Sequence, residues 1–184
     1  MALLREREGS LAERIAADSE ALAEVRARLR AVEDGHRATR GAVEEVALPA
    51  VDVVGVAETV RDETEIPGAV ARLLAALGVD GGAPGSDVLL AFDGRTDPGV
   101  VVVRAAVVGA GGAADAAAVR LVLPAAATAV AVHLPELLAS TADAWIALDD
   151  AAASRGLRTT GPFRQTLHAN GGVTLATPVV PLAD

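Results

Sequence analysis

The sequence contains no cysteine, and its aromatic residues are limited to one tryptophan and two phenylalanines. Without cysteine the chain cannot form a disulfide, hold an iron–sulfur cluster or use a thiol nucleophile. Long apolar runs are also missing. No segment approaches the roughly 20 residues of a membrane helix, and the N-terminal MALLREREGS lacks the apolar core of a secretory signal. These absences favour a cytoplasmic protein.

The composition that is present indicates a folded chain. Apolar residues make up 52% of the 184 positions and charged residues 22%, so we expect one domain with an additional segment. The net charge is −9, and residues 1–40 hold eight basic and eight acidic side chains, so the acidic excess lies in residues 41–184. A neutral segment followed by an acidic domain predicts that this chain does not bind DNA by itself.

Apolar side chains recur with a period of seven through residues 1–33. This period predicts a coiled-coil helix of roughly 50 Å that buries its apolar seam against a second helix. Pairing between two copies of the chain is favoured, and packing of the helix on its own domain is the alternative. The flanking charges do not determine whether the pair is parallel or antiparallel. The predicted dimer-interface residues are Leu4, Leu11, Ile15, Leu22, Val25, Leu29 and Val32.

Two glycines and a proline in residues 35–50 end this periodicity, and we expect a short linker at residues 35–40. The chain therefore divides into a coiled-coil and linker region at residues 1–40 and a globular domain at residues 41–184.

Within the domain, the order strand, helix, strand, strand occurs twice. Apolar, β-branched runs predict the strands, and the segments DGRTDPG and HANGG predict hairpin turns. Two such units make an α+β domain whose helices cover one face of antiparallel strands. The first unit has strands at 51–60, 88–92 and 100–108 with a helix at 66–77; the second has strands at 119–123, 128–134, 163–168 and 173–181 with a helix at 136–155.

Few residue patterns point to chemistry. The histidines His36, His133 and His168 are not spaced as metal ligands, and the acidic pair Asp149 and Asp150 is typical of a solvated face. No nucleophile elbow and no phosphate-binding loop is present. Trp145 lies in the second predicted helix, where core packing is favoured over a place in a pocket wall. The sequence therefore predicts no catalytic residue, no metal and no cofactor.

Three segments carry a resemblance to a known family: LLREREGSLAERIAADSEALAEVRARLRAVE, ADAWIALDDAAASRGLRTTGPFRQTL and ATPVVP. The last two resemble the GyrI-like effector-binding domain, which is found alone and as the C-terminal half of multidrug-sensing MerR-type transcription regulators. The first resembles the MerR linker helix, which in that family forms an antiparallel coiled coil between subunits. The resemblance implies two strand-helix-strand-strand modules that enclose a cleft for a bulky apolar or cationic small molecule.

The cleft in this family often contains a glutamate and a tyrosine in a pattern like G-P-x-R-E-x-Y, where this chain has Gln165 and Leu167. A neutral amide cannot balance a ligand cation, and it cannot act as the general base of the family's hydrolases. We therefore expect a bulky, uncharged apolar ligand and no enzymatic activity. The predicted ligand-binding residues are Trp145, Gln165, Phe163, Leu167 and His133.

The leading hypothesis is the small-molecule-sensing and dimerisation region of a MerR-type regulator, which contacts DNA only through a helix-turn-helix domain that is not in this sequence. One alternative is a stand-alone binding protein that sequesters a toxic hydrophobic compound. A hydrolase of the GyrI-like type is the last-ranked alternative. No membrane partner is expected.

Overall fold

The computed structural model describes residues 2–39, 43–79, 85–97, 99–109, 118–135 and 141–182. Its helices are α1 (Ala2–Thr39), α2 (Ile66–Ala76) and α3 (Thr141–Ala153), with a 3-10 turn, η1 (Glu63–Glu65), before α2. The strands are β1 (Glu44–Leu48), β2 (Val51–Val60), β3 (Val88–Asp97), β4 (Val100–Val107), β5 (Val119–Leu123), β6 (Ala126–Leu134), β7 (Leu157–Thr159), β8 (Phe163–Leu167) and β9 (Val173–Pro181). They form one antiparallel sheet in the order β1-β6-β9-β8-β3-β4-β2-β5, with β7 paired to β9.

The domain contains the same unit twice, as the sequence predicts. The first half is β2-α2-β3-β4 and the second is β6-α3-β8-β9, and the two halves join where β3 pairs with β8. Both predicted hairpins are confirmed, because β3 pairs with β4 and β8 pairs with β9. Since the strand order reverses about the β3–β8 pair, an approximate twofold axis relates the halves.

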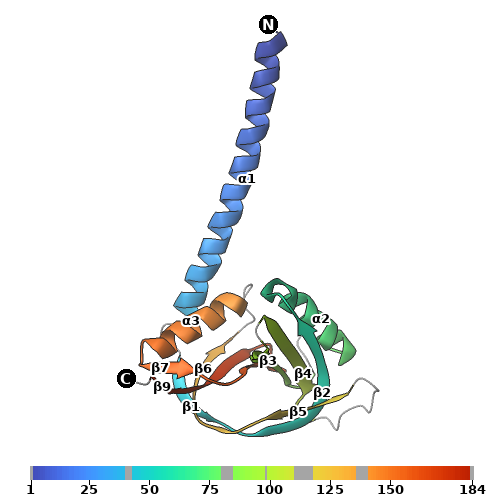
Figure 1. Cartoon of the computed structure of the whole chain (residues 1–184), viewed down its shortest axis with the longest axis vertical. Coiled ribbons are helices and arrows are strands. Elements are labelled where there is room, and N and C mark those ends of the chain that lie inside the picture. Colours follow the sequence, from blue (N-terminus) through green and yellow to red (C-terminus); the bar gives the residue numbers. More distant parts are fainter. Residues whose placement is uncertain are drawn as a thin grey trace.

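The outer strands are exchanged between the halves. β1 precedes β2 in the chain but pairs with β6, whereas β5 precedes β6 but pairs with β2. The triplet Leu-Pro-Ala stands at both connections, at residues 48–50 and 123–125. Proline cannot donate to a strand ladder, so each triplet interrupts pairing and lets the ribbon change partners. Figure 1 shows the β1–β2 and β5–β6 ribbons crossing below the central strands.

Three details differ from the sequence analysis. α1 continues to Thr39, so the linker expected at residues 35–40 is helical over most of its length. A single glycine costs a helix only about 1 kcal/mol, which the residues around Gly35 offset. The sequence pattern does not predict β1, which begins with two glutamates, or β7, which has three residues. The predicted helix segment at residues 136–140 lies outside the described residues.

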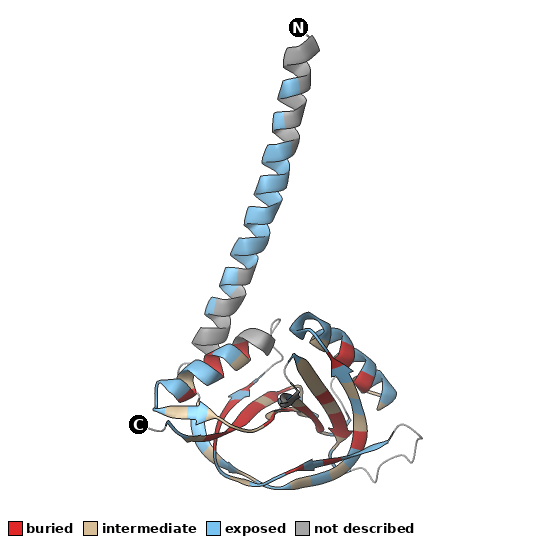
Figure 2. Ribbon diagram, viewed as in Figure 1, coloured by how far each residue is buried: buried red, intermediate tan, exposed pale blue. Residues whose placement is uncertain are grey.

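Both α2 and α3 pack on the same face of the sheet. α2 covers a core cluster that includes Leu90 and Val103, and α3 covers one that includes Val132 and Leu175. Each buried side chain of this size contributes roughly 1.5–3 kcal/mol of hydrophobic free energy. Residues that alternate with these along the strands face the other way, and a third cluster around Leu121 lies there. Figure 2 shows the buried positions concentrated on the strands and on the inner sides of both helices.

α1 projects from the domain as a rod, and its C-terminal end lies beside α3 (Figure 1). Figure 2 shows exposed residues along its length. The side chains of Leu4 and Val32 lie outside the described residues. The other five predicted interface residues are between 48% and 64% exposed: Leu11, Ile15, Leu22, Val25 and Leu29. Pairing of α1 with a second copy stays a prediction. None of the described helices is long and apolar enough to cross a membrane.

Candidate ligand-binding face

The central strand β8 turns alternate side chains toward the helices. Gln165 is paired with Leu90 of β3, whose side chain lies in the core cluster under α2, and paired residues point to the same face. Phe163, Gln165 and Leu167 therefore lie on the helix-covered face, and Leu167 packs against the clusters of both halves. We call this region, where β3 and β8 meet under α2 and α3, the junction face.

All three aromatic rings of the chain meet on the junction face. The ring centre of Trp145, on α3, lies 4.8 Å from that of Phe163 and 6.4 Å from that of Phe92. Phe92 and Phe163 are directly paired across β3 and β8. Tilted and edge-on arrangements of this kind are the favourable ones for aromatic side chains. Because all three residues are only partly buried, ring surface remains accessible at the junction face.

Two polar side chains are buried on the same side of the sheet. Gln165 is 4% exposed, and its amide has no hydrogen-bond partner among the described residues, although its polar atoms are not fully enclosed as the hydroxyl of Thr177 is. Thr177, on β9, is fully buried beneath α3, and its hydroxyl has no partner among the described residues. An unpaired buried polar group costs about 1–3 kcal/mol. Gln165 is therefore a hydrogen-bonding group available to a ligand beside the aromatic rings. Neither Thr177 nor Phe92 is among the ligand-binding residues predicted from the sequence.

His133 lies on the other face of the sheet. The two residues that flank it on β6 belong to the core cluster under α3, so its own side chain points away from Trp145. Its Nδ1 lies 3.1 Å from Oγ1 of Thr174, and its ring centre lies 5.5 Å from that of His168. The expectation that His133 lies around Gln165 is therefore wrong, because strand alternation places the two side chains on opposite faces.

Arg164 connects the two exchanged ribbons. Its guanidinium donates to the carbonyl oxygen of Pro49 at 2.9 Å and to the carbonyl oxygen of Pro124. These prolines are the middle residues of the two Leu-Pro-Ala triplets, so one side chain bridges equivalent points of the two halves. Arg164 is 5% exposed, and this burial lowers the pKa of the guanidinium from its ordinary value. It positions the strand that carries Gln165.

The two C-terminal segments of the family resemblance meet in space. A Cβ atom at Gly161 would lie 2.3 Å from Cγ of Pro178, so only glycine allows this approach. The amide of Thr160 also donates to the carbonyl oxygen of Pro178 at 2.9 Å. The strings GPFRQTL and ATPVVP thus hold β8 against β9.

A groove of about 440 Å³ lies next to this contact, and Pro124, Pro162 and Pro178 are among its lining residues. None of the aromatic side chains lines it. Across the described ranges no group of three histidine or acidic side chains is arranged to hold a metal ion. The cleft expected between the halves stays a prediction.

No protein-family model and no curated protein matches this chain. Several solved structures are similar to it, among them the following three. The integron cassette protein VCH_CASS2 of Vibrio cholerae is 12% identical with a TM-score of 0.60 over 76% of this chain and 97% of that one. EcmrR in a DNA complex is 17% identical with a TM-score of 0.54 over 99% and 73%. SAV2435 bound to tetraphenylphosphonium is 15% identical with a TM-score of 0.52 over 75% and 93%.

This chain shares the fold of these three proteins. At such low identity the similarity shows the fold alone, and it agrees with the GyrI-like fold that the sequence resemblance implies. The match to EcmrR extends over α1 as well as the domain, because it covers 99% of this chain.

Proposed function

We propose that this chain is the small-molecule-sensing and dimerisation region of a MerR-type transcription regulator in the cytoplasm. The observation that carries the proposal is the junction face, where three partly exposed rings and one unpaired amide meet between two modules. A ligand held there touches both halves of the domain, so its binding can change how they sit together and pass a signal to α1 through α3. The EcmrR structure, a DNA complex, supports the regulatory context.

The ligand at this face is bulky, apolar and uncharged, and it leaves chemically unchanged. SAV2435 is bound to the cation tetraphenylphosphonium. Gln165 offers a hydrogen bond but no negative charge, so a cation gains no Coulomb attraction from it. An amide also cannot take up a proton as a general base.

Ligand binding is measured with the full chain by fluorescence of Trp145, its only tryptophan. We expect the neutral probe triphenylphosphine oxide to change the emission more strongly, at equal concentration, than tetraphenylphosphonium. Gln165→Glu adds a carboxylate beside the rings and reverses this preference. The control is Thr59→Glu, which adds the same charge on an exposed position of β2. Emission that neither probe changes contradicts the binding site.

Dimerisation through α1 is tested by the mass of the chain in solution. We expect a dimer, because the open apolar seam of α1 needs a second helix to cover it. Leu22→Asp places a charge in the seam and gives a monomer, whereas Ala23→Asp places it beside the seam and leaves the dimer intact. A chain that is monomeric at all concentrations contradicts the proposal.

A stand-alone binding protein is the second candidate. The structure of VCH_CASS2 favours it, because that chain is almost entirely this domain. One measurement distinguishes the two functions. A sensor changes its α1 or dimer properties when the probe binds, which hydrogen exchange of α1 amides detects, and a sequestering protein does not.

A further inference from the structure

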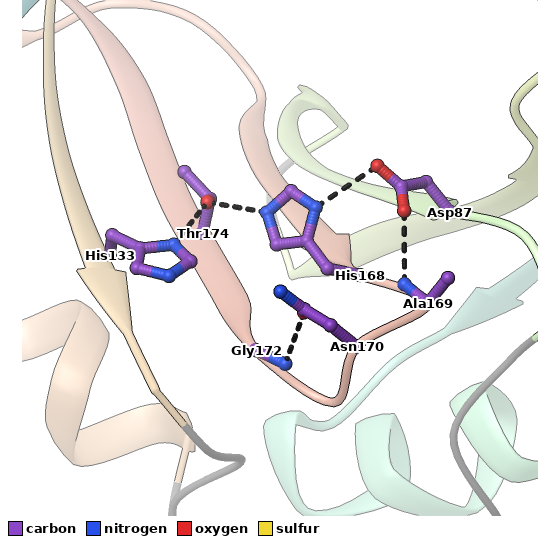
Figure 3. A network of polar contacts seen from close by, with 7 residues as sticks. All are labelled: Asp87, His133, His168, Ala169, Asn170, Gly172 and Thr174. Carbon is purple, nitrogen blue, oxygen red and sulfur yellow. Dashed lines mark hydrogen bonds and ion pairs between the residues drawn. The ribbon is translucent and has the colours of Figure 1, made fainter.

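A chain of polar contacts lies on the face of the sheet opposite the junction face (Figure 3). Oδ2 of Asp87 lies 3.0 Å from Nδ1 of His168, and Nε2 of the same imidazole lies 2.7 Å from Oγ1 of Thr174. A carboxylate, an imidazole and a hydroxyl in this order are the arrangement that activates a hydroxyl nucleophile. The three residues come from the segment before β3, the β8–β9 turn and β9.

The protons of these hydrogen-bonded groups can be placed without conflict. Asp87 is the carboxylate end: a bond from the amide of Ala169 at 3.0 Å and the contact with His168 lower its pKa. Its charge keeps a proton on Nδ1 of His168, which leaves Nε2 free to accept the hydroxyl proton of Thr174. Nδ1 of His133, 3.1 Å from the same hydroxyl, then acts as a donor to it. One lone pair of Oγ1 remains for attack.

The side-chain amide of Asn170 offers a donor on the same side of these contacts (Figure 3). Oδ1 of Asn170 accepts a bond from the amide of Gly172 at 3.0 Å, which orients its side-chain nitrogen the other way. Figure 3 shows that nitrogen turned toward the space between the two imidazole rings. The site is open to solvent, since the side chains of His168 and Asp87 are 26% and 42% exposed. Donors aimed at a developing oxyanion are a main source of catalysis in acyl transfer.

We propose that Thr174, His168 and Asp87 form an acyl-transfer site that takes small carboxylic esters. The hydroxyl oxygen of Thr174 attacks the ester carbonyl, and His168 takes its proton and gives it to the departing alcohol. The bond from the acyl group to the alcohol oxygen breaks as the bond to Thr174 forms. Water then attacks the acyl-threonine, His168 takes a proton from that water and passes it to the oxygen of Thr174 as the acyl–oxygen bond breaks, and the carboxylic acid leaves. Asp87 is a positioning residue, which acts through His168.

This proposal goes beyond ligand sensing and does not depend on it, because the two sites occupy opposite faces of the sheet. It differs from the expectation that the chain has no enzymatic activity, which stays a prediction. Nothing in the glutamate-and-tyrosine pattern of the family predicts it, since that pattern maps to Gln165 and Leu167 on the junction face.

The test uses p-nitrophenyl acetate with the full chain. We expect release of p-nitrophenolate and an acetyl group on Thr174, detected by mass spectrometry of the peptides. Thr174→Val keeps the shape of the side chain and lowers the rate at least 100-fold, as does His168→Asn. Thr174→Ser retains both the hydroxyl and the activity. Asp87→Asn shifts the pH profile of the rate, which a purely structural contact would not do.

His36→Asn is the matched control, because it removes the histidine that lies in α1 and leaves the rate unchanged. Circular dichroism and the emission of Trp145 verify that each variant is folded. An acetyl group on histidine alone, a rate unchanged in folded Thr174→Val, or a loss in Thr174→Ser as large as in Thr174→Val would overturn the proposal. Probe binding at the junction face remains intact in Thr174→Val, so the two proposals fail separately.

Discussion

In the first half of the domain α2 packs on the sheet through aliphatic side chains, whereas in the second half α3 carries the only tryptophan onto two phenylalanines. The central pair shows the same contrast, because the first half contributes Leu90 and the second contributes Gln165. The polar chain of Figure 3 also draws His133, His168 and Thr174 from the second half.

The comparison indicates how a duplicated fold acquires function. The strand order and the exchanged ribbons are common to both halves, since each half needs the other to pair its outer strand. The side chains between strands and helices differ. The second half therefore supplies most of the functional side chains, namely two of the three rings, the amide and two histidines, while the first half adds Phe92 and Asp87.

Loss of the Arg164 contact, which joins the two halves, is expected to have the largest effect on stability. Arg164→Met removes the two charge-assisted hydrogen bonds to the carbonyls of Pro49 and Pro124, which join the two connections. We expect a loss of about 2–4 kcal/mol in the free energy of unfolding, measured by urea denaturation. The unfolding remains one transition, because the halves share this contact. Arg158→Met, at an exposed position of β7, changes stability by less than about 0.5 kcal/mol. Two separate transitions would show that the halves are independent.

Each half contains one glycine, Gly55 or Gly161, at which an added Cβ would clash, and the costs of the two substitutions can be compared. A Cβ at Gly55 would lie 2.1 Å from the carbonyl oxygen of Ala105, whereas a Cβ at Gly161 would meet the ring of Pro178. Gly55→Ala must move a strand backbone and costs about 3 kcal/mol, and Gly161→Ala must move the ring of Pro178 with the backbone to which it is bonded and costs about 2 kcal/mol. Thermal unfolding measures both. Gly85→Ala, where a Cβ meets nothing within 4 Å, is the control. Equal losses for Gly55 and Gly161 would contradict this ranking.

Substitutions at the central pair, Leu90 and Gln165, test whether the first position stabilises the fold and the second binds the ligand. Leu90→Gln buries an amide in an apolar cluster and costs about 2 kcal/mol. Gln165→Leu removes a buried amide without a described partner and raises stability by about 1 kcal/mol, but it weakens probe binding. Urea denaturation and fluorescence of Trp145 measure the two effects. A stability loss in Gln165→Leu would mean that the amide supports the fold.

The smallest effect concerns an ion pair in the first half. Nη2 of Arg72 lies 2.5 Å from Oε1 of Glu58, and this bond lowers the pKa of the glutamate. A carboxyl group with a lowered pKa stabilises the folded state above its ordinary pKa and loses that contribution as the pH falls. Arg72→Ala therefore lowers stability at pH 7 slightly and reduces the loss of stability on acidification below about pH 4 by the same small amount. Melting curves at pH 7 and pH 3.5, with Arg158→Ala as control, measure this. If Arg72→Ala loses as much stability on acidification as the unsubstituted protein, the ion pair contributes nothing to stability.

Much of the fold can be predicted from local patterns. The bounds of β2, β5 and β9 agree with the sequence analysis, because Val-rich runs end at turns or prolines. α2 ends where Gly78 adopts a φ of 72°, a conformation that favours glycine. The grouping of Phe163, Gln165 and Leu167 follows from their alternation along one strand.

The rest depends on pairing between distant segments. His133 is separated from Gln165 because of the register of β6 on β9, which no local pattern in β6 specifies. The meeting of Asp87 with His168 joins residues 81 positions apart. The exchange of β1 and β5 between the halves is equally non-local, although the repeated Leu-Pro-Ala triplet marks both connections.

Periodicity and turn chemistry within short segments are enough to predict most of the helices and strands, the duplication and the apolar seam of α1. The faces that side chains share, the bridge that Arg164 makes between the two ribbons and the place of Thr174 between two imidazoles depend on contacts between distant segments. Strand register sets these contacts across the sheet, and the packing of the whole domain selects the register.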